Sequence, residues 1–398
     1  MKKKCKICNG NFLDKLDLGK HPCADTFLKD RKKAINLKKY SLIVAYCQCS
    51  HLTSINRVPE RERYEKYEYS YTSDNSPVSR KHFKTIASKI SKSFKLSQDS
   101  LVIEAGSNDG TFLNEIRKFS GAKVLGVDPS KNISRLAKKK KIQTYINYFN
   151  YKNSKYIKSK YGKADIFYGA NVFNHVDDNI DFLKGINNIL KENGVLVLEV
   201  PDLNSLISGV GFDTIYHEHR HYYSEKSLKK ILSKENLYIF KFEKISYMSG
   251  SIRIFARKKY SKISKKLSFI SLQNFRKFKK NINLVTDKII QFVNQNKIKN
   301  KKIYGVGAAT KGNTLLNFCN LNHKHIDSIL DKSNHKINKY TPGSGIKIVN
   351  ESKVKNIEAM IILPWNITRH LKKKIMKKKK IPYISIQKAI KEINEKKK

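Results

Sequence analysis

Four short apolar runs alternate along the middle of the chain with stretches whose apolar residues repeat at helical spacing. The runs have the length of buried strands and lie at 101–105, 123–127, 164–171 and 194–200, and the helical stretches lie at 110–119, 130–139 and 178–191. Strands and helices that alternate in this way form a parallel, doubly wound sheet with helices on both faces. The sequence therefore predicts a central α/β domain.

The stretch 101–113 holds the strongest motif in this domain. It is predicted to form a strand, a loop and a helix, and the loop contains Gly106 and Gly110, where a ligand can approach bare backbone at a helix N-terminus. About 20 residues later the next strand ends in Asp128, the usual place of a ribose-binding carboxylate in a βαβ unit. An ordinary strand-to-helix turn is the alternative without a ligand. Loop and acid together predict a cofactor that contains a nucleoside.

Two acids distinguish between the possible cofactors. A dinucleotide site has the pattern G-x-G-x-x-G, whereas this loop is Gly-Ser-Asn-Asp-Gly and carries Glu104 and Asp109. These acids would repel a pyrophosphate but suit S-adenosylmethionine (SAM), whose amino and sulfonium groups are positive. The motif resembles that of class I SAM-dependent methyltransferases, and EAGSNDGTFL is similar to the first motif of the sugar C-methyltransferases. The resemblance implies a cofactor site made of Glu104, Gly106, Asn108, Gly110, Asp128 and Asn171.

Four of the six cysteines form two close pairs near the N-terminus. Cys5 and Cys8 form a C-x-x-C pair, and Cys47 and Cys49 form a C-x-C pair about 40 residues later. Thiolates at such spacing can close a tetrahedral zinc site, which stabilises a segment too short to build its own core. Reduced structural cysteines are the alternative. We expect a bound Zn²⁺ and the reducing conditions of the cytoplasm.

The sugar C-methyltransferase family resembles the chain here too, since its members have a small zinc-binding domain with two C-x-x-C pairs. In this chain Tyr46 stands where the third ligand is expected. We therefore expect Cys47 to take its place. The reserve ligands are Cys23, His21 and His51.

A cluster of titratable residues lies between 213 and 224. His217, Glu218, His219 and His221 fall within five positions, which is typical of a functional site. Zinc proteases need His-Glu-x-x-His on a helix, which is absent here, while a metal on a strand and a plain histidine-rich loop remain alternatives. The sugar C-methyltransferases have a similar Tyr-His-Glu-His followed by Tyr and Ser. That resemblance implies His219 as the general base, with Tyr216 and Glu218 around the reacting sugar.

Three further segments are interpreted through the same resemblance. Tyr71 lies in a tyrosine-rich segment that could simply pack on the core, but it matches a substrate-facing tyrosine of the family. His175 could be a base, yet it matches a loop that closes over the cofactor, and we expect no catalytic role for it. The segment 250–253, Gly-Ser-Ile-Arg, is similar to a later strand of the family.

A second strand, glycine loop and helix begin at 302, after a helical linker predicted at 267–296. G-x-G alone is a weak signal for a second coenzyme site, and no ribose-binding acid follows at the expected strand end. Together with 341–345 and 363–366 the segment resembles the family's C-terminal Rossmann-like domain, which implies help in holding a nucleotide-sugar. The predicted boundaries are 1–65 for the zinc-binding domain, 66–262 for a class I (Rossmann-like) SAM-dependent methyltransferase domain, and 263–398 for a C-terminal Rossmann-like α/β domain with its helical linker.

The 398 residues carry a formal net charge of +49, which would ordinarily suggest nucleic acid as a partner. The lysines are scattered over nearly every segment, so we favour compositional drift over a binding stripe. The lysine runs at 138–141 and 373–380 are expected to be solvated. No apolar run approaches about 18 residues, so neither a membrane segment nor a signal peptide is expected.

The resemblance implies methylation at C3 of a nucleotide-linked 4-keto-deoxysugar by a cytoplasmic enzyme. The expected partner is the nucleotide-sugar, without specific nucleic acid or membrane, and the chain is expected to be a monomer or weak homodimer. Methylation of oxygen or nitrogen on a nucleotide-sugar is the first alternative. An RNA methyltransferase is less favoured, because the sequence lacks the Asn/Asp-Pro-Pro-Tyr/Phe and Pro-Cys acceptor motifs. A non-catalytic binding module is the remaining alternative.

Overall fold

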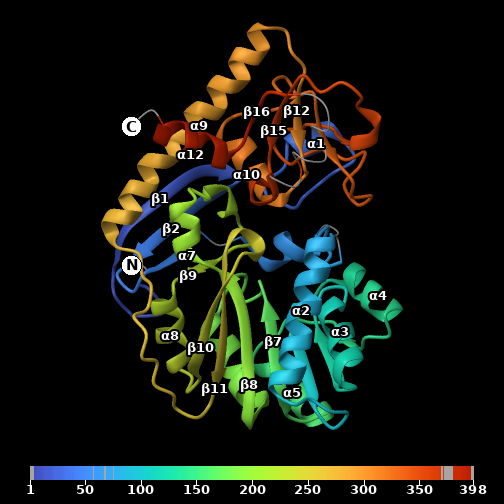
Figure 1. Cartoon of the computed structure of the whole chain (residues 1–398), viewed down its shortest axis with the longest axis vertical. Helices are drawn as coiled ribbons and strands as arrows, with labels where there is room; N and C mark the ends of the chain where they lie inside the picture. The colour runs from blue at the N-terminus through green and yellow to red at the C-terminus, as the bar shows by residue number, and fades with distance from the viewer. Residues whose placement is uncertain are drawn as a thin grey trace.

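The structure is a computed structural model that describes residues 4–56, 58–66, 69–74, 76–368, 371 and 380–395. This part of the chain contains three β-sheets, of four, seven and five strands. Figure 1 shows the seven-stranded sheet in the lower half of the molecule, with the C-terminal lobe above it and the long helix α9 along one side. The lysines at 373, 374 and 377–379 lie outside the described residues.

The seven-stranded sheet has the order β10-β11-β8-β7-β4-β5-β6. The five strands from β8 to β6 in this order are parallel, and β10 and β11 extend the sheet in antiparallel register. The strands are β4 (Leu101–Ala105), β5 (Lys123–Val127), β6 (Thr144–Tyr145), β7 (Ala164–Ala170), β8 (Leu190–Pro201), β10 (Tyr238–Ile245) and β11 (Ser251–Arg257). The predicted strands and the parallel sheet are thus confirmed.

Helices cover both faces of this sheet because alternate strand residues point to opposite sides. Val102 joins one buried cluster with α2 and α3, whereas its neighbour Ile103 joins another with α5, α6 and α8. The helices of this region are α2 (Pro77–Ser93), α3 (Thr111–Ser120), α4 (Lys131–Lys139), α5 (Tyr151–Tyr161), α6 (Asn179–Ile189), α7 (Leu203–Ser208) and α8 (Glu225–Ser233), with short turns η1 (Arg61–Glu65), η2 (Phe212–Thr214) and η3 (Tyr247–Ser249). The doubly wound arrangement therefore follows from the two-residue period of the strands.

The four-stranded sheet combines the N-terminal segment with a strand from much later in the chain. Its order is β1-β2-β3-β9, all antiparallel. The strands are β1 (Phe12–His21), β2 (Tyr40–Cys47), β3 (His51–Ser54) and β9 (His221–Tyr223). Strand β9 lies in the predicted catalytic segment, directly after His219 and Arg220, so this sheet holds the end of that segment.

The C-terminal lobe is built on a parallel sheet of order β14-β13-β12-β15-β16. Its elements are α9 (Leu272–Ile298), β12 (Ile303–Val306), α10 (Thr310–Phe318), β13 (Ser328–Asp331), β14 (Ile348–Asn350), η4 (Glu351–Lys353), β15 (Ala359–Ile362), η5 (Trp365–Ile367), β16 (Tyr383–Ile384) and α12 (Ile386–Glu395). Helix α1 (Arg31–Ile35) lies against this lobe in Figure 1, and the backbone N–H of Gly343 donates to the carbonyl of Ala34 at 2.8 Å. The N-terminal segment therefore contacts both other parts of the chain.

Of the lysine run at 138–141, three side chains are exposed as expected. Lys140 is the exception, because its amino group lies 3.3 Å from a carboxylate oxygen of Asp109 and donates to the hydroxyl of Thr111 at 2.8 Å. The expectation of a uniformly solvated run is therefore wrong at Lys140. Among the described residues, no helix combines the length and apolar character that crossing a membrane requires.

Candidate active site

The loop between β4 and α3 is held open by its glycines and fixed by an acid. Gly106 and Gly110 have φ values of 66° and 72°, in the left-handed region that glycine adopts without strain. Asp128, at the end of β5, accepts hydrogen bonds from the backbone N–H of Asn108 at 2.9 Å and of Ser130 at 2.8 Å. The predicted ribose-binding acid thus also ties the glycine loop to the neighbouring strand.

A second segment lies over this loop. The side-chain amide of Asn108 accepts from the backbone N–H of Ser73 at 2.8 Å and donates to the carbonyl of Tyr71 at 3.1 Å. Asp109 accepts from the backbone N–H of Asp74 at 3.1 Å. The polar residues of the glycine loop therefore bring the Tyr71 segment next to the predicted cofactor site.

Glu104 and Asn171 border the same place. Glu104 is 4% exposed and its Oε2 atom has no hydrogen-bond partner. Burial raises the pKa of Glu104 well above its ordinary value, and the nearby acids Asp109 and Asp128 add to the shift. Asn171, at the end of β7, has a φ of 54° and donates its backbone N–H to the carbonyl of Glu199 at 2.8 Å. A buried acid without a partner is the kind of group that a positively charged ligand satisfies, so these residues fit the amino end of SAM.

The predicted base, His219, is oriented by backbone. Its Nδ1 lies 2.7 Å from the carbonyl oxygen of Thr214, so the ring donates from Nδ1 and keeps a lone pair on Nε2. The Tyr216 ring lies with its centroid 4.0 Å away. Burial lowers the pKa of His219 to about 4, so the ring is neutral near pH 7. A backbone carbonyl, and not a neighbouring carboxylate, therefore orients the ring.

Glu218 directly precedes His219 in the sequence, but its buried side chain has different neighbours. It is 2% exposed, and its Oε1 atom has no hydrogen-bond partner. Burial, with a contribution from Asp25, raises its pKa to about 8 against the opposing charge of Arg63. Burial, with Glu218 as the next cause, also raises the pKa of Tyr216 well above its ordinary value. Both side chains therefore hold a proton near pH 7 and can donate hydrogen bonds.

His217 points away from these residues. It is 1% exposed and its Nε2 atom donates to the carbonyl of Tyr40 at 3.2 Å. The turn at 217–218 thus separates His217, which packs on the N-terminal sheet, from His219.

Tyr71 begins a chain of contacts that the sequence did not reveal. Its hydroxyl lies 3.2 Å from the hydroxyl of Tyr247, whose ring stacks on His82 with centroids 3.9 Å apart. His82 Nε2 lies 2.7 Å from a carboxylate oxygen of Glu199, which is fully buried and also accepts from Arg253 at 2.7 Å. Burial alone would raise the pKa of Glu199, but His82 and Arg253 hold it below its ordinary value. Arg253 belongs to the segment that resembled a family strand, and it also donates to Glu243 at 3.0 Å.

His175 lies against the predicted base rather than only over the cofactor loop. Its ring centroid is 4.8 Å from that of His219, and its Nδ1 atom lies 2.9 Å from the hydroxyl of Tyr64. Arg63 donates to the His175 carbonyl at 3.2 Å and pairs with Asp177 at 2.8 Å. Nothing in the sequence indicated that His175 and His219 would be in contact.

Asp25 and Lys311, from two other parts of the chain, lie near the predicted catalytic residues. Asp25, from the N-terminal segment, accepts from the Ser70 hydroxyl at 2.7 Å and from the Thr310 hydroxyl at 2.8 Å. Lys311, in α10, has its amino group 4.1 Å from the centroid of a Trp365 ring and carries a pKa lowered by burial to about 8. All three parts of the molecule therefore meet at the predicted catalytic segment.

The four predicted zinc ligands also converge. The sulfur atoms of Cys5, Cys8, Cys47 and Cys49 all lie within 4.8 Å of one another. The pairs Cys5–Cys49 and Cys47–Cys49 are 3.8 and 3.6 Å apart, close to the sulfur separation of about 3.8 Å that tetrahedral bonds of about 2.3 Å require. His51 Nδ1 stays 4.0 Å from the Cys5 sulfur. The cysteine cluster thus fits Zn²⁺ with Cys47 as the third ligand.

The other reserve ligands are occupied elsewhere. His21 is buried and its Nε2 atom donates to the carbonyl of Leu18 at 2.6 Å. Cys23 is buried outside the four-cysteine cluster, and burial raises the pKa of its thiol to about 12, with Glu218 as the next cause. Tyr46, at the position of the missing ligand, donates to the carbonyl of Ile270.

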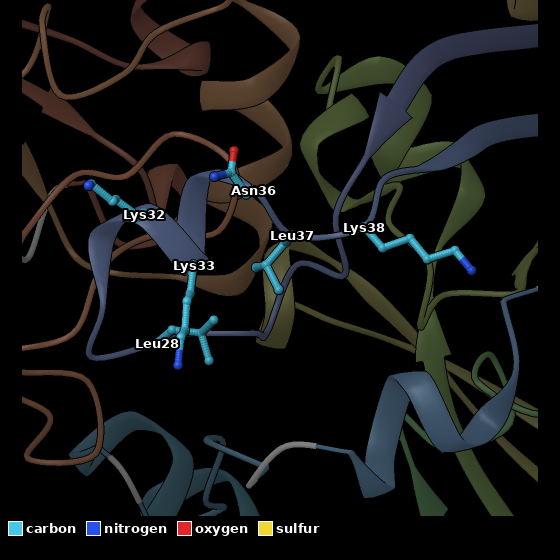
Figure 2. Close-up of a pocket in the computed structure, with 6 residues that line it drawn as sticks. All are labelled: Leu28, Lys32, Lys33, Asn36, Leu37 and Lys38. Atoms are coloured by element: carbon cyan, nitrogen blue, oxygen red, sulfur yellow. The ribbon is translucent and has the colours of Figure 1, made fainter.

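A surface pocket lies on the N-terminal segment around α1. Its volume is about 460 Å³, and it is lined by Leu28, Lys32, Lys33, Asn36, Leu37 and Lys38. Figure 2 shows the side chains of Lys32 and Lys38 pointing in opposite directions. The pocket contains none of the predicted site residues and no converging polar groups.

Two family models match consecutive parts of the chain. Residues 78–241 match a methyltransferase domain, and residues 249–384 match the C-terminal domain of C-methyltransferases. Over 377 residues, 91% of this chain and 89% of the relative, the sequence is 28% identical to the C-methyltransferase NovU of Streptomyces niveus.

Solved structures align with slightly less than half of the chain. The magnesium protoporphyrin IX methyltransferase ChlM of Synechocystis PCC 6803 with bound SAH aligns with a TM-score of 0.36 and 16% identity, covering 45% of this chain and 83% of that one. An S-adenosylmethionine-dependent methyltransferase of Clostridium acetobutylicum ATCC 824 aligns with a TM-score of 0.36 and 14% identity, covering 46% and 93%. Together, the two family models and the relative that spans most of its length identify the chain as a SAM-dependent methyltransferase whose C-terminal part is similar to that of C-methyltransferases.

Proposed function

We propose that this methyltransferase transfers a methyl group to C3 of a nucleotide-linked 4-keto-deoxysugar. The observation that carries the proposal is the neutral His219, which donates from Nδ1 to a carbonyl and keeps Nε2 as a base within a buried site. A carbon bound to hydrogen becomes a nucleophile only when a base removes the proton and a neighbouring carbonyl takes up the charge. A base of this kind beside buried hydrogen-bond donors suits that chemistry.

The cofactor residues are proposed as predicted. Gly106 and Gly110 leave the backbone open, Asp128 receives the ribose hydroxyls, and Glu104 with Asn171 receives the amino acid end of SAM. Asn108 shapes the loop through its contacts with the Tyr71 segment. When bound, SAM supplies an electrophilic methyl group.

The proton and charge movements follow from the protonation states. His219 Nε2 takes the C3 proton, and the electron pair of the broken C–H bond moves onto the ketone oxygen as an enolate. Tyr71 and Tyr216 are protonated near pH 7 at any rate, and Glu218 keeps its proton there because burial raises its pKa to about 8, so all three can donate to that oxygen or to a sugar hydroxyl. The enolate carbon would then form the new C–C bond as the methyl–sulfur bond breaks and the sulfur keeps that electron pair, and His219 would return its proton to solvent.

The zinc site is proposed to be structural. Cys5, Cys8, Cys47 and Cys49 would supply all four ligands, which leaves no open position for a substrate. The cluster lies beside β3, which pairs with β9 at the end of the catalytic segment. Bound Zn²⁺ would therefore stabilise the sheet on which that segment ends.

The proposed partner is the nucleotide-sugar, held with help from the C-terminal lobe. Specific nucleic acid, membrane attachment and a strong oligomer are not part of the proposal, and we propose that the enzyme works in the cytoplasm as a monomer or weak homodimer. The second candidate is methylation of a sugar hydroxyl, because a neutral histidine can deprotonate oxygen as well as carbon.

The test is solvent deuterium exchange together with product analysis. With a panel of nucleotide-linked ketosugars, the enzyme should introduce deuterium at C3 and, with SAM, yield a C-methylated product by mass spectrometry. His219→Ala should abolish both reactions and leave SAM affinity nearly unchanged, whereas the matched variant His217→Ala should cost far less because His217 faces Tyr40. Methylation of oxygen in keto-free sugars at full rate would refute carbon methylation.

A further inference from the structure

The turn that holds His219 is itself held by the C-terminal lobe. This turn comprises residues 211–215 and contains Thr214, whose carbonyl accepts from His219 Nδ1 at 2.7 Å. The indole N–H of Trp365, in η5, donates to both carboxylate oxygens of Asp213 at 3.0 and 2.9 Å. Asp213 is 0% exposed, so this charge depends on protein partners alone.

The Trp365 ring also fills the space beside the turn. A Cβ atom placed on Gly211 would lie only 3.2 Å from Cζ2 of the ring, so the ring packs directly on the backbone there. Lys311 places its amino group 4.1 Å from the ring centroid and donates to Asn366 at 2.8 Å. The ring thus contacts both the turn and α10.

The charges around Asp213 strengthen the contact. Burial raises the pKa of Asp213 to about 6, while the charge of Lys311 and the hydrogen bond from Trp365 work against that shift. The carboxylate is therefore mostly ionised near pH 7, and hydrogen bonds to a charged acceptor are about twice as strong as neutral ones. Removing the indole N–H would leave a buried charge with one fewer donor.

We propose that Trp365 and Asp213 are positioning residues for the catalytic base: the indole of the C-terminal lobe fixes the 211–215 turn, and the turn fixes the Nδ1–H tautomer and direction of His219. This inference rests on the proposed role of His219. It assigns to the C-terminal lobe a part in the chemistry in addition to holding substrate. Removing the indole N–H of Trp365 should then lower kcat, although Trp365 takes no proton from the substrate.

The test uses the full chain with Trp365→Phe, which keeps an aromatic ring but removes the indole N–H. We expect kcat and the rate of C3 deuterium exchange to fall together by about 10- to 100-fold, with SAM affinity and the KM for the sugar nearly unchanged. Thr314→Val is the matched control, because it removes another contact of α10 with the turn, to the carbonyl of Ile215 at 3.4 Å, and should retain nearly full activity.

Two further measurements separate positioning from general damage. Asp213→Asn should lower kcat similarly, and the double variant with Trp365→Phe should lose little more than the worse single variant, since both act through one hydrogen bond. In ¹⁵N spectra of the histidines, with His219 assigned by its absence in His219→Asn, the Nδ1–H tautomer should lose population in Trp365→Phe.

Each outcome has a definite meaning. Wild-type kcat in Trp365→Phe, or a parallel loss of SAM affinity and fold in both Trp365→Phe and Asp213→Asn, would overturn the inference. If the unmodified enzyme neither exchanges nor methylates any ketosugar, the proposed function fails instead. The ¹⁵N tautomer measurement still decides the positioning inference in that case, because it needs no substrate.

Discussion

Asp128 accepts the backbone N–H of Asn108 at 2.9 Å and so joins the end of β5 to the glycine loop that follows β4. Each carboxylate oxygen has a second lone pair, so Asp128 can hold the loop and still receive ribose hydroxyls. Asp128→Ala should therefore weaken SAM binding at least tenfold, about 1.4 kcal/mol. Asp128→Asn keeps the size of the side chain and should weaken it less. Isothermal titration with SAM measures both, and unchanged affinity in Asp128→Ala would place the cofactor elsewhere.

The opposite pKa shifts of His219 and Glu218 predict the pH dependence of catalysis. Burial lowers the pKa of His219 to about 4, so the base is already neutral from about pH 5 upward. Burial raises the pKa of Glu218 to about 8, so its proton is lost only above that value. We expect kcat/KM to be flat between about pH 5 and 8 and to fall at higher pH. In Glu218→Gln, which cannot ionise, the fall in kcat/KM at high pH should disappear. A fall that persists in this variant would mean that ionisation of Glu218 is not its cause.

Glu218 also makes stability depend on pH. Its pKa in the folded protein is raised from 4.5 to about 8, so its contribution to stability is fully present below about pH 4.5 and is lost as the pH rises through 8. Glu218→Gln should therefore melt higher than the unmodified protein at pH 8.5, with the difference shrinking towards pH 5. Thermal unfolding at several pH values checks this, and a pH-independent difference would contradict the raised pKa.

The cysteine cluster predicts about one Zn²⁺ per purified chain by elemental analysis. Cys8→Ser should lose the metal and loosen the N-terminal sheet, whereas Cys319→Ser, which removes a buried cysteine outside the cluster, should retain it. Circular dichroism and limited proteolysis report the loosening. Metal-free protein with an intact N-terminal sheet would show that the cysteines are only structural thiols.

The contact between the hydroxyls of Tyr71 and Tyr247 predicts two different losses. Tyr71→Phe should lower kcat by about 100-fold if this hydroxyl donates to the enolate oxygen, as loss of one oxyanion donor does. Tyr247→Phe removes only the partner and should cost less, with the stack on His82 retained. Steady-state kinetics with the ketosugar distinguishes the two. Equal losses would mean that the pair acts as one structural unit.

The scattered lysines predict weak, nonspecific contact with polyanions. Binding of single-stranded RNA should fall steeply with added salt and vanish near physiological ionic strength, while recognition of a nucleotide-sugar in a pocket should change little. Fluorescence anisotropy over a salt series measures this. Saturable RNA binding at physiological salt would instead favour the RNA methyltransferase alternative.

Local patterns were enough to predict the central domain. The alternation of apolar runs and helical stretches specified β4, α3, β5 and α4 within a few residues, because such elements are determined by the spacing of side chains along a few turns. The convergence of the four cysteines was also predictable from local spacing, since two close pairs can meet around one ion. The separation of His217 from His219 was not predictable in this way, because strand alternation would place residues two apart on the same face, and a turn at 217–218 divides them instead.

Contacts between distant parts of the chain could not be predicted in this way. Nothing near Asp213 in the sequence indicates that Trp365, 152 positions later, donates to it. Likewise the contact of His82 with Glu199 needs the packing of α2 on the sheet, and Lys140 looks like any other member of a lysine run until Asp109 lies beside it. Side-chain chemistry is visible in a sequence, but which groups desolvate one another depends on tertiary packing.

The short strand β9 has a consequence for building chimeric enzymes. Because it completes the N-terminal sheet while coming just after Tyr216 to His219 in the chain, the N-terminal and methyltransferase parts share a strand and cannot be exchanged as separate modules. A hybrid that takes residues 1–65 from a relative would have to bring the matching partner for His51–Ser54 as well. We expect recombination between relatives to succeed only where both pieces are inherited together.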